Sequence, residues 1–427
     1  MSVKMDLQGK SILILGGGPQ QLRLIQRAKA RGAFVVVSDQ SDKAPGLALA
    51  DKHLCCSNRD VEFLTAAVKR LNLEAITTLG SDKAMVTVAE VAKNFGLKFN
   101  LTKASARIAT HKEEMGEAFQ REKVPMSRRT VLKDGDSWEK CLSLSFPLVL
   151  KPSDSQGQKG ITKVSAPQEL SDAITFARDW SSDGKVIVDE FTAGLEIAAH
   201  AWAVDGNVIW IGLTDRVTYN PDPFLGIAFQ HIFPSRFSCS HRVVIHQIVQ
   251  SVLTAYEMRD GPLFIQMIVG KNGVTVIEAG ARVSGGNETV LFQAVAGVDF
   301  LDASLNLAIG IDTAKCFQNL SKPRHGIINF ILANPGIVAS QSQMHELISQ
   351  GFVDDGGWYR EIGFQQGRTQ DAYGRIGWFM QSGYSRNEVL QSARQSYSRI
   401  VVRDTQGRSM QFWPDLLSFD AYDLDRE

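Results

Sequence analysis

The sequence predicts a mixed α/β and α+β protein built from three consecutive segments. Residues 11–100 alternate between strand-like and helix-like patterns, which is typical of a doubly wound parallel sheet. Residues 261–287 contain two alternating apolar runs joined by a tight-turn signal, which predicts an antiparallel hairpin. A further strand and helix pattern follows toward the C-terminus. We therefore expect domains over residues 1–105, 106–320 and 321–427.

The composition excludes several classes of protein. The chain has 427 residues, of which 44% are hydrophobic and 22% are charged, and its formal net charge is zero. This balance favours neither nucleic acid nor an acidic membrane surface as a partner. The five cysteines include no C-x-x-C pair, and no apolar run approaches the roughly 18 residues of a membrane span. We expect a cytoplasmic protein that binds neither nucleic acid nor membrane.

Short apolar runs in the N-terminal segment predict buried strands, and amphipathic runs predict the helices between them. The predicted strands are residues 11–15, 34–37 and 75–79, and the predicted helices are residues 20–31, 60–71 and 83–95. The first strand ends in three glycines, Gly16 to Gly18, but Gln21 stands where a dinucleotide fingerprint needs a small residue. Such a turn also binds anions through free N–H groups. We prefer a carboxylate-binding or structural turn over an NAD site.

Two lysines stand at positions suited to phosphate. Lys112 lies in the first turn of a predicted helix that runs from about residue 110 to 122. Lys151 ends a strand over residues 148–151, and small and polar residues follow it in a segment that we call the Gly-rich loop, residues 153–160. Backbone N–H groups of such a loop can bind phosphate oxygens, and a lysine supplies a point charge. A mobile surface hairpin remains an equal alternative.

Acidic and basic residues surround the next strands. Asp189 ends a strand, and Glu196 follows it seven positions later across a glycine turn. Residues 215–236 contain three prolines and read as an irregular loop, and long loops within compact domains are often functional. Arg216 and His231 in that loop are candidate substrate contacts, and His231 is a candidate base for the amine, although a packed core histidine is the simpler interpretation.

The predicted hairpin carries two oxygen-bearing side chains. Gln266 and Glu278 are 12 positions apart, on opposite arms of the hairpin, so they can face the same space. Mg²⁺ prefers oxygen ligands and shares its shell with nucleotide phosphates. Arg282 and the Gly285-Gly286 pair follow directly. The hairpin therefore predicts a magnesium site, with a solvated edge hairpin as the alternative.

The order of these features along the chain resembles that of the ATP-grasp superfamily. The order is a lysine at a helix start, a strand lysine followed by the Gly-rich loop, two spaced acids, and the hairpin. The resemblance covers nearly the whole chain and is strongest to carbamoyl-phosphate-synthase-like and L-amino-acid-ligase-like members. It implies an ATP-grasp domain over residues 106–320, with a small lid at about residues 145–190, before the C-terminal α+β domain.

The resemblance also implies residue roles. The residues expected to contact ATP are Lys112, Lys151, Ser153, Gln156, Gly157, Asp189, Glu190, Phe191, Thr192 and Glu196. Within this set Asp189 matches the hinge acid that faces adenine, and Glu196 matches the ribose-binding glutamate. Gln266 and Glu278 match the metal positions, and Arg282 and Lys151 the catalytic positions. The residues expected at the substrate are Arg216, His231, Arg282, Ser284, Gly285 and Gly286.

Three positions depart from the family pattern. Gln266 and Asp189 stand where many members have glutamate, and Gly280 stands where many have asparagine. The substitutions at 266 and 280 leave the number of Mg²⁺ ions, one or two, open.

The resemblance implies an ADP-forming ligase that joins a small-molecule carboxylate to an amine through an acyl phosphate, with ATP and Mg²⁺ as cofactors. Amino acids or amino-acid-like compounds are the expected substrates. The alternatives are a biotin-carboxylase-like or carbamoyl-phosphate-type enzyme that uses bicarbonate, and an ATP-binding protein without turnover. Family members are often dimers, so the resemblance leaves a homodimer open.

Overall fold

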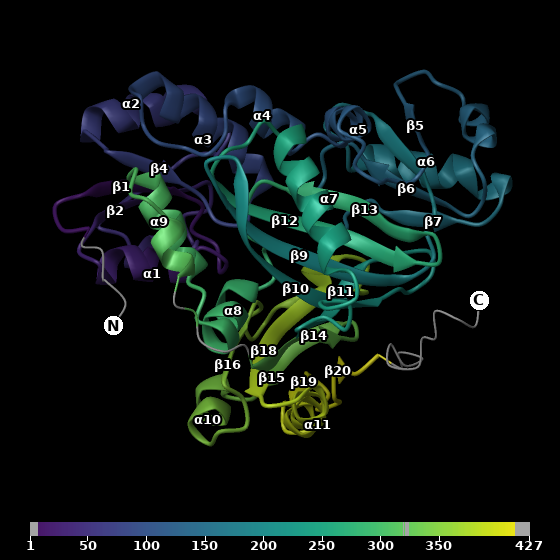
Figure 1. The fold of residues 1–427 in the computed structure, drawn as a ribbon. Helices are drawn as coiled ribbons and strands as arrows, with labels where there is room; N and C mark the ends of the chain where they lie inside the picture. Colours follow the sequence, from purple (N-terminus) through teal and green to yellow (C-terminus); the bar gives the residue numbers. More distant parts are fainter. Residues whose placement is uncertain (1–6, 319, 321–323, 415–427) are drawn as a thin grey trace.

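The computed structural model describes residues 7–318, 320 and 324–414 (Figure 1). The N-terminal unit is a four-stranded sheet in the order β3-β2-β1-β4, in which all neighbouring strands are parallel. Its elements are β1 (Ser11–Leu15), α1 (Leu22–Ala30), β2 (Phe34–Asp39), β3 (Lys52–Cys55), α2 (Val61–Leu71), β4 (Ala75–Thr77) and α3 (Asp82–Phe95). The predicted doubly wound sheet is confirmed, and β3 was missed because only Leu54 of its residues is buried, so the strand shows no apolar run.

A second sheet of nine strands runs through the centre of the molecule in the order β13-β12-β9-β10-β11-β14-β18-β16, with β20 pairing to β14. Its first strands are β9 (Leu195–Val204), β10 (Asn207–Tyr219), β11 (Ile227–Phe233), β12 (Gly261–Gly270) and β13 (Gly273–Gly280). The remaining strands are β14 (His325–Ala333), β16 (Asp355–Trp358), β18 (Arg375–Gly383) and β20 (Gln411–Phe412). One sheet thus joins the second and third predicted domains, and their boundary near residue 320 stays a prediction.

Helices pack their apolar faces against this sheet. Helix α7 (Arg242–Ala255) buries residues such as Ile245, Val249 and Val252 in a core shared with β9, β12 and β13. Helices α8 (Glu288–Ala296) and α9 (Phe300–Ala308) pack between the central sheet and the N-terminal unit. By length and composition, no single helix among the described residues could cross a membrane, and α8 with α9 pass only as a pair bent by 112°.

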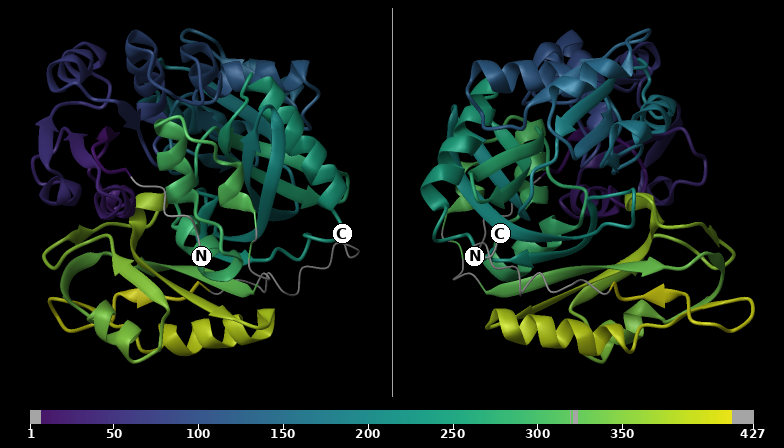
Figure 2. Two further views of the ribbon diagram at one scale, coloured as in Figure 1. Left: turned by 60° about the vertical axis from the view of Figure 1, so that its left-hand side comes forward. Right: turned by 90° about the vertical axis from the view of Figure 1, so that its right-hand side faces the viewer.

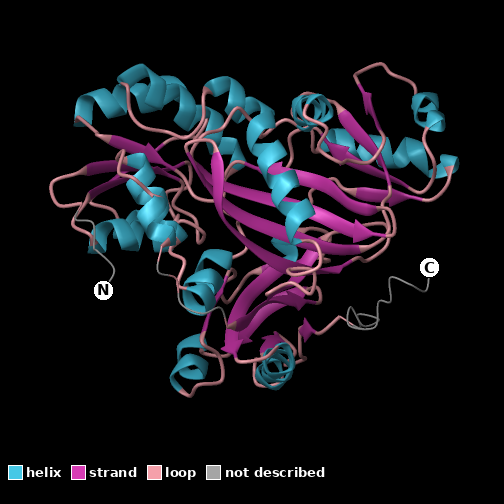
Figure 3. Cartoon of the chain, in the orientation of Figure 1, coloured by secondary structure: helices cyan, strands magenta, loops and turns pink. Residues whose placement is uncertain are grey.

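Residues 129–190, which include the segment predicted as a lid at about residues 145–190, form a separate antiparallel sheet in the order β5-β8-β6-β7, which we call the lid sheet; its role as a lid stays a prediction. Its strands are β5 (Arg129–Leu132), β6 (Leu148–Pro152), β7 (Thr162–Val164) and β8 (Val186–Glu190), and α6 (Leu170–Asp179) packs against them. Two helices lead into it, α4 (Lys103–Ile108) and α5 (Lys112–Arg121). Figures 1 and 3 show this small sheet and the N-terminal unit on opposite sides of the central sheet.

The C-terminal part lies below the central sheet in all three views (Figure 2). Its small sheet has the order β17-β15-β19, and two helices accompany it. The elements are β15 (Gly336–Gln341), α10 (Met344–Ser349), β17 (Gln365–Gln366), α11 (Arg386–Tyr397) and β19 (Val402–Asp404).

The prediction of an irregular loop over residues 215–236 is wrong. Strand β10 continues to Tyr219, and β11 occupies residues 227–233, so only the segment between them is a turn. All seven residues of β11 are buried, because the strand lies inside the sheet and is covered on both faces. Such a strand shows no alternation of apolar and polar residues, which is the signal that the prediction depended on.

Candidate functional site

Two cavities meet at the hairpin of β12 and β13. The first, which we call the hinge cleft, has a volume of about 650 Å³ and lies between the lid sheet and the central sheet. The second, which we call the junction cavity, has a volume of about 330 Å³ and is lined by all three parts of the chain. Gln266, Glu278, Arg216, Gln158 and Ile161 line both. The hairpin thus contributes two residues, Gln266 and Glu278, to the wall that the two cavities share.

Lys151 lies in the hinge cleft, where strand β6 ends beside β8. Its Nζ is 2.6 Å from Oδ2 of Asp189, and Arg129 Nε is 2.9 Å from Oδ1 of the same carboxylate. Lys151 and Asp189 are both buried. Asp189 lines the cleft, but its carboxylate neutralises two cations, so a contact between Asp189 and an adenine stays a prediction.

The segment after Asp189 forms one wall of the hinge cleft. Glu190, Phe191 and Thr192 all line it, and the prediction that their backbone groups face a base stays a prediction. The side chains of two of them are engaged elsewhere, since Arg128 donates to Glu190 at 3.0 Å and the hydroxyls of Ser127 and Thr192 are 2.8 Å apart. Backbone groups are therefore what this wall offers to a ligand.

Glu196 also lines the hinge cleft, at the start of β9. Its carboxylate pairs with Arg216 of β10, whose other nitrogen donates to the carbonyl of Gly226 at 2.6 Å. The pair places Arg216 on the border of both cavities. The prediction that Glu196 contacts a ribose stays a prediction.

Lys112 contacts both the Gly-rich loop and the hairpin. Its Nζ donates to the carbonyl of Ser155 at 2.7 Å and lies 4.0 Å from Oε1 of Glu278, and its backbone N–H donates to the carbonyl of Ser153. The lysine is buried and lies outside the lining of both cavities. Lys112 therefore links the loop to the hairpin acid.

Gln266 and Glu278 are direct partners across β12 and β13, and the register shifts immediately after Gln266. Both line both cavities, so the prediction that they face the same space is confirmed. No cluster of three or more His, Cys, Asp or Glu side chains suited to a metal occurs in the described ranges. The chain thus supplies two oxygen-bearing side chains at this point.

Arg282 lies in the junction cavity, and Asp82 of α3 holds it. The guanidinium pairs with both oxygens of Asp82, at 2.7 Å for Nη2, and Nη1 donates to the carbonyl of Val283 at 3.1 Å. Burial opposes the charge, but Asp82 outweighs burial and holds the pKa of Arg282 above its usual range. A Cβ at Gly280 would lie 3.3 Å from Arg282 and 3.4 Å from Asp82, so glycine leaves room for this pair.

His231 and Glu288 form a buried pair in the junction cavity. His231 Nε2 lies 3.3 Å from Oε1 of Glu288, and the hydroxyl of Ser284 donates to the other carboxylate oxygen, Oε2. Burial, together with Arg216 and Arg375, holds the pKa of His231 well below its usual range, so the imidazole is neutral. A neutral ring that donates to Glu288 is a packed, polar wall of the cavity rather than a strong base.

The remaining predicted substrate residues lie around this pair. Gly285 and Gly286 line the junction cavity, whereas Ser284 lies behind them with its hydroxyl on Glu288. Gln20 of the glycine-rich turn donates to the carbonyl of Gly285 at 2.8 Å, and residues 18–21 line the same cavity. Asp39, at the end of β2, accepts a hydrogen bond from the N–H of Gly17 and so holds the glycine-rich turn in place.

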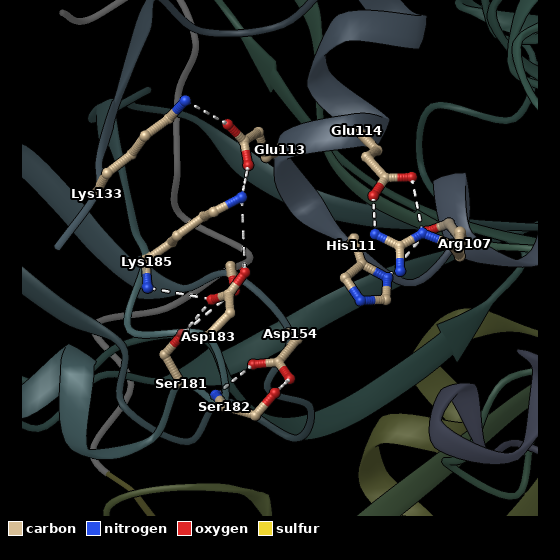
Figure 4. Close-up of polar contacts among 11 residues, drawn as sticks. Arg107, His111, Glu113, Glu114, Lys133, Asp154, Ser181, Ser182, Asp183 and Lys185 are labelled. Atoms are coloured by element: carbon tan, nitrogen blue, oxygen red, sulfur yellow. Dashed lines mark hydrogen bonds and ion pairs between the residues drawn. The ribbon is translucent and has the colours of Figure 1, made fainter. Parts of the chain in front are cut away.

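The base of the Gly-rich loop is fixed within the lid. The hydroxyl of Ser153 donates to Asp183 at 2.5 Å, and Asp154 accepts from the N–H of Ser182 at 3.0 Å. Figure 4 shows these acids beside Lys185, which pairs with Glu113 of α5. Ser153 therefore lies outside both cavities, and only Gln156 and Gly157 of the predicted loop contacts line the junction cavity.

The tip of the Gly-rich loop is held by the C-terminal part. Lys159 Nζ lies 3.9 Å from the centre of the Tyr373 ring, and the N–H of Ala372 donates to the carbonyl of Gly157 at 3.0 Å. These contacts fasten the loop over the border of the two cavities.

Replacing Tyr373 with alanine is expected to raise the rate of tryptic cleavage after Lys159 by about two- to fivefold, the factor that follows from losing an exposed cation–π contact. Mass spectrometry of short digests measures this rate. Tyr384→Ala, which removes another exposed ring of the C-terminal part, is the control and should leave cleavage at Lys159 unchanged. Equal rates in wild type and Tyr373→Ala would show that Tyr373 does not hold the loop.

Sequence reasoning missed several residues of the junction cavity. Asp82, Glu288, Tyr359, Tyr373 and Arg375 all line it. Asp215, which precedes Arg216 on β10, is fully buried and lies 2.8 Å from Arg386. The missed residues are isolated in sequence and far from the hairpin, so no local pattern could assign them to one site.

Residues 144–290 match the family model of the ATP-grasp domain. Among curated proteins, formate-dependent phosphoribosylglycinamide formyltransferase of Sulfurisphaera tokodaii is 26% identical over 192 residues, which are 43% of this chain and 47% of that protein. The large chain of carbamoyl phosphate synthase from Thermoanaerobacter sp. is 26% identical over 182 residues, 41% of this chain and 16% of that protein. The chain thus spans about half or less of the curated relatives it matches.

Solved structures share the fold over nearly the whole chain. The L-amino acid ligase from Bacillus licheniformis has a TM-score of 0.80 and 17% identity, covering 93% of this chain and 99% of that one. Phosphoribosylglycinamide synthetase from Anaerococcus prevotii has a TM-score of 0.74 and 20% identity, covering 93% and 100%. Residues 144–290 thus match an ATP-grasp domain, and the chain shares the fold of these two enzymes over nearly its whole length.

Proposed function

We propose that this chain is an ADP-forming carboxylate–amine ligase that acts through an acyl phosphate and joins amino acids or amino-acid-like compounds. The observation that carries this proposal is the shared wall. Gln266 and Glu278 line a cleft that contains a lysine and a backbone-rich wall, and they also line a second cavity that contains Arg282. A phosphoryl donor in the first and an acceptor in the second would meet at these two side chains.

In this proposal ATP occupies the hinge cleft. The backbone of residues 190–192 faces the base, and Glu196 faces the ribose. Lys151 lies at the phosphate end, where a phosphate oxygen would share it with Asp189. The volume of about 650 Å³ suits a ligand of this size.

The oxygens of Gln266 and Glu278 fit a Mg²⁺ ion. Two side-chain oxygens, from Gln266 and Glu278, are the small protein contribution typical of a Mg²⁺ that is also bound by phosphates and water. The ion, when bound, neutralises charge that develops on the transferred phosphoryl group. Glutamine at 266 lowers the negative charge of the site by one relative to glutamate, so we expect one tightly held ion.

The carboxylate of the substrate must be activated before an amine can attack it, because an oxide is a poor leaving group. A carboxylate oxygen of the substrate forms a bond to the γ-phosphorus as the bond to the β–γ bridging oxygen breaks, which yields an acyl phosphate and ADP. The amine nitrogen then attacks the acyl carbon, the C–O bond to phosphate breaks, and one amine proton leaves. The chain's own task is to orient the groups and spread charge, through Lys151 on one side and Arg282 on the other.

A coupled assay of ADP release over pairs of amino acids and small carboxylic acids tests the proposal. We expect release that requires both an acid and an amine together with Mg²⁺, and an amide product by mass spectrometry. ADP release that depends on bicarbonate would instead indicate a biotin-carboxylase-like reaction. A biotin carboxylase domain from Hydrogenobacter thermophilus, in complex with MgADP, ADP and bicarbonate, has a similar fold, with a TM-score of 0.72 and 16% identity. ATP binding without release by any pair would contradict a ligase.

Two further properties stay predictions. A homodimer is expected only by analogy with the family, and light scattering of the purified chain at several concentrations measures it. A cytoplasmic location is expected from composition, and fractionation of cells that express a tagged chain tests it.

A further inference from the structure

The junction cavity contains cations that differ in how their charge is balanced. Arg282 pairs with Asp82, and Arg216 pairs with Glu196. Arg375, at the start of β18, forms no ion pair with any acid in the described part of the chain. Its Nε donates to the carbonyl of Ala372 at 2.8 Å, and its guanidinium lies 4.1 Å from the centre of the Phe330 ring.

A positive charge inside a protein lowers the free energy of unfolding unless an anionic group lies beside it. Burial, together with Arg216, lowers the pKa of Arg375 although Tyr359, Glu288 and Asp371 act in the opposite direction, and an arginine keeps its charge at neutral pH. With Nε used by Ala372, the two terminal nitrogens remain for the cavity that Arg375 lines. A guanidinium placed in this way matches the two oxygens of a carboxylate.

Tyr359 adds a second donor beside Arg375. Its hydroxyl accepts a hydrogen bond from the amide of Asn287 at 2.6 Å, so its own proton is free to be donated. Burial raises the pKa of Tyr359 to about 12, and the hydroxyl therefore stays protonated. The N–H of Tyr359 donates to the carbonyl of Ile376 at 2.8 Å, which fixes the tyrosine beside the strand that carries Arg375.

An acceptor faces the same space. Glu288 lines the junction cavity and is held there by the hydroxyl of Ser284 and by His231. A cavity with a carboxylate acceptor and an unbalanced guanidinium is complementary to a molecule that carries an ammonium and a carboxylate. Arg282, by contrast, lies beside the hairpin pair where the phosphoryl group would arrive.

From these contacts we propose that Arg375 and Tyr359 bind a carboxylate of an α-amino acid substrate that does not react, with Glu288 facing its amino group. This inference rests on the proposed ligase function and adds a specificity site that is contributed by the C-terminal part. The site would thus recognise the substrate by a carboxylate that is still present in the product. The reacting carboxylate or amine would lie toward Arg282.

Binding without turnover tests this site. The probes are the common L-amino acids and their carboxamides, which lack the negative charge, and isothermal titration measures their affinity for the wild-type chain. We expect at least one acid to bind about 10- to 100-fold more tightly than its carboxamide, the range for a hydrogen bond to a charged group. Arg375→Met is expected to remove this difference, and Tyr359→Phe to reduce it.

Arg403→Met, at an exposed arginine of the same C-terminal part, is the matched control and should keep the wild-type preference. Failure of every amino acid to bind the wild type, equal binding of acid and carboxamide, or an unchanged preference in both Arg375→Met and Tyr359→Phe would overturn the inference. Because binding needs no ADP release, a chain that prefers the acids but produces no ADP would contradict the ligase proposal and leave this site standing.

Discussion

Replacing Glu278 with alanine is expected to lower the rate of ADP release by on the order of 100-fold or more, the usual effect of removing one preorganised charge from a phosphoryl-transfer site. Glu278 is the only acid of the hairpin pair, and it lines both cavities. Its loss leaves Gln266 as the one side-chain oxygen opposite Lys112, whose Nζ lies 4.0 Å from the glutamate. The concentration of Mg²⁺ that gives half-maximal rate should therefore rise together with the fall in rate.

A Mg²⁺ titration of ADP release in Glu278→Ala and Glu278→Gln measures this effect. Glu117→Ala removes an exposed acid of α5 that lies outside both cavities, and it should keep the wild-type rate and Mg²⁺ dependence. An unchanged Mg²⁺ requirement in both Glu278 variants would show that this glutamate does not bind the ion.

Replacing Arg282 with methionine is expected to have two large effects. Asp82 would lose both of its guanidinium hydrogen bonds and remain inside the protein without a cation, which costs about 3–5 kcal/mol of folding free energy. The rate of ADP release should also fall by on the order of 100-fold, because the acceptor side loses its positive charge. Denaturant unfolding and the ADP assay measure the two effects separately.

The double variant Asp82→Asn with Arg282→Met separates stability from activity. Neutralising Asp82 removes the unpaired charge, so we expect most of the folding free energy to return while the rate stays low. Asp82→Asn alone should keep the charge on Arg282 but loosen its position, with a smaller loss of rate. Recovery of the rate in the double variant would show that Arg282 acts only as a structural partner of Asp82.

Much of the fold could be predicted because local signals agreed with it. The alternating pattern of residues 261–287 gave the β12–β13 hairpin, and the pairing of Gln266 with Glu278 followed from that register. The N-terminal strands were visible because each is a short apolar run next to an amphipathic helix. Here local pattern and final packing depend on the same residues.

The site was less predictable because its polar residues are engaged by partners far away in sequence. Arg282 pairs with an acid 200 positions earlier, and Asp189 is shared by Lys151 and Arg129. The buried strand β11 showed no alternation, so His231 was placed in a loop instead of a sheet. Arg375 follows no motif at all, and only the nine-stranded sheet brings it to the junction cavity.

The continuity of that sheet has a mechanical consequence. Glu278, Arg216 and Arg375 all belong to its strands or their ends, whereas Lys151 and Asp189 belong to the separate four-stranded sheet of the lid. A swing of the lid would therefore admit and release a nucleotide while the spacing between the metal-side acid and the amino-acid side stayed constant. The residues that would set the distance between the metal and the amino acid thus belong to one continuous sheet, and the lysine expected at the phosphates belongs to another.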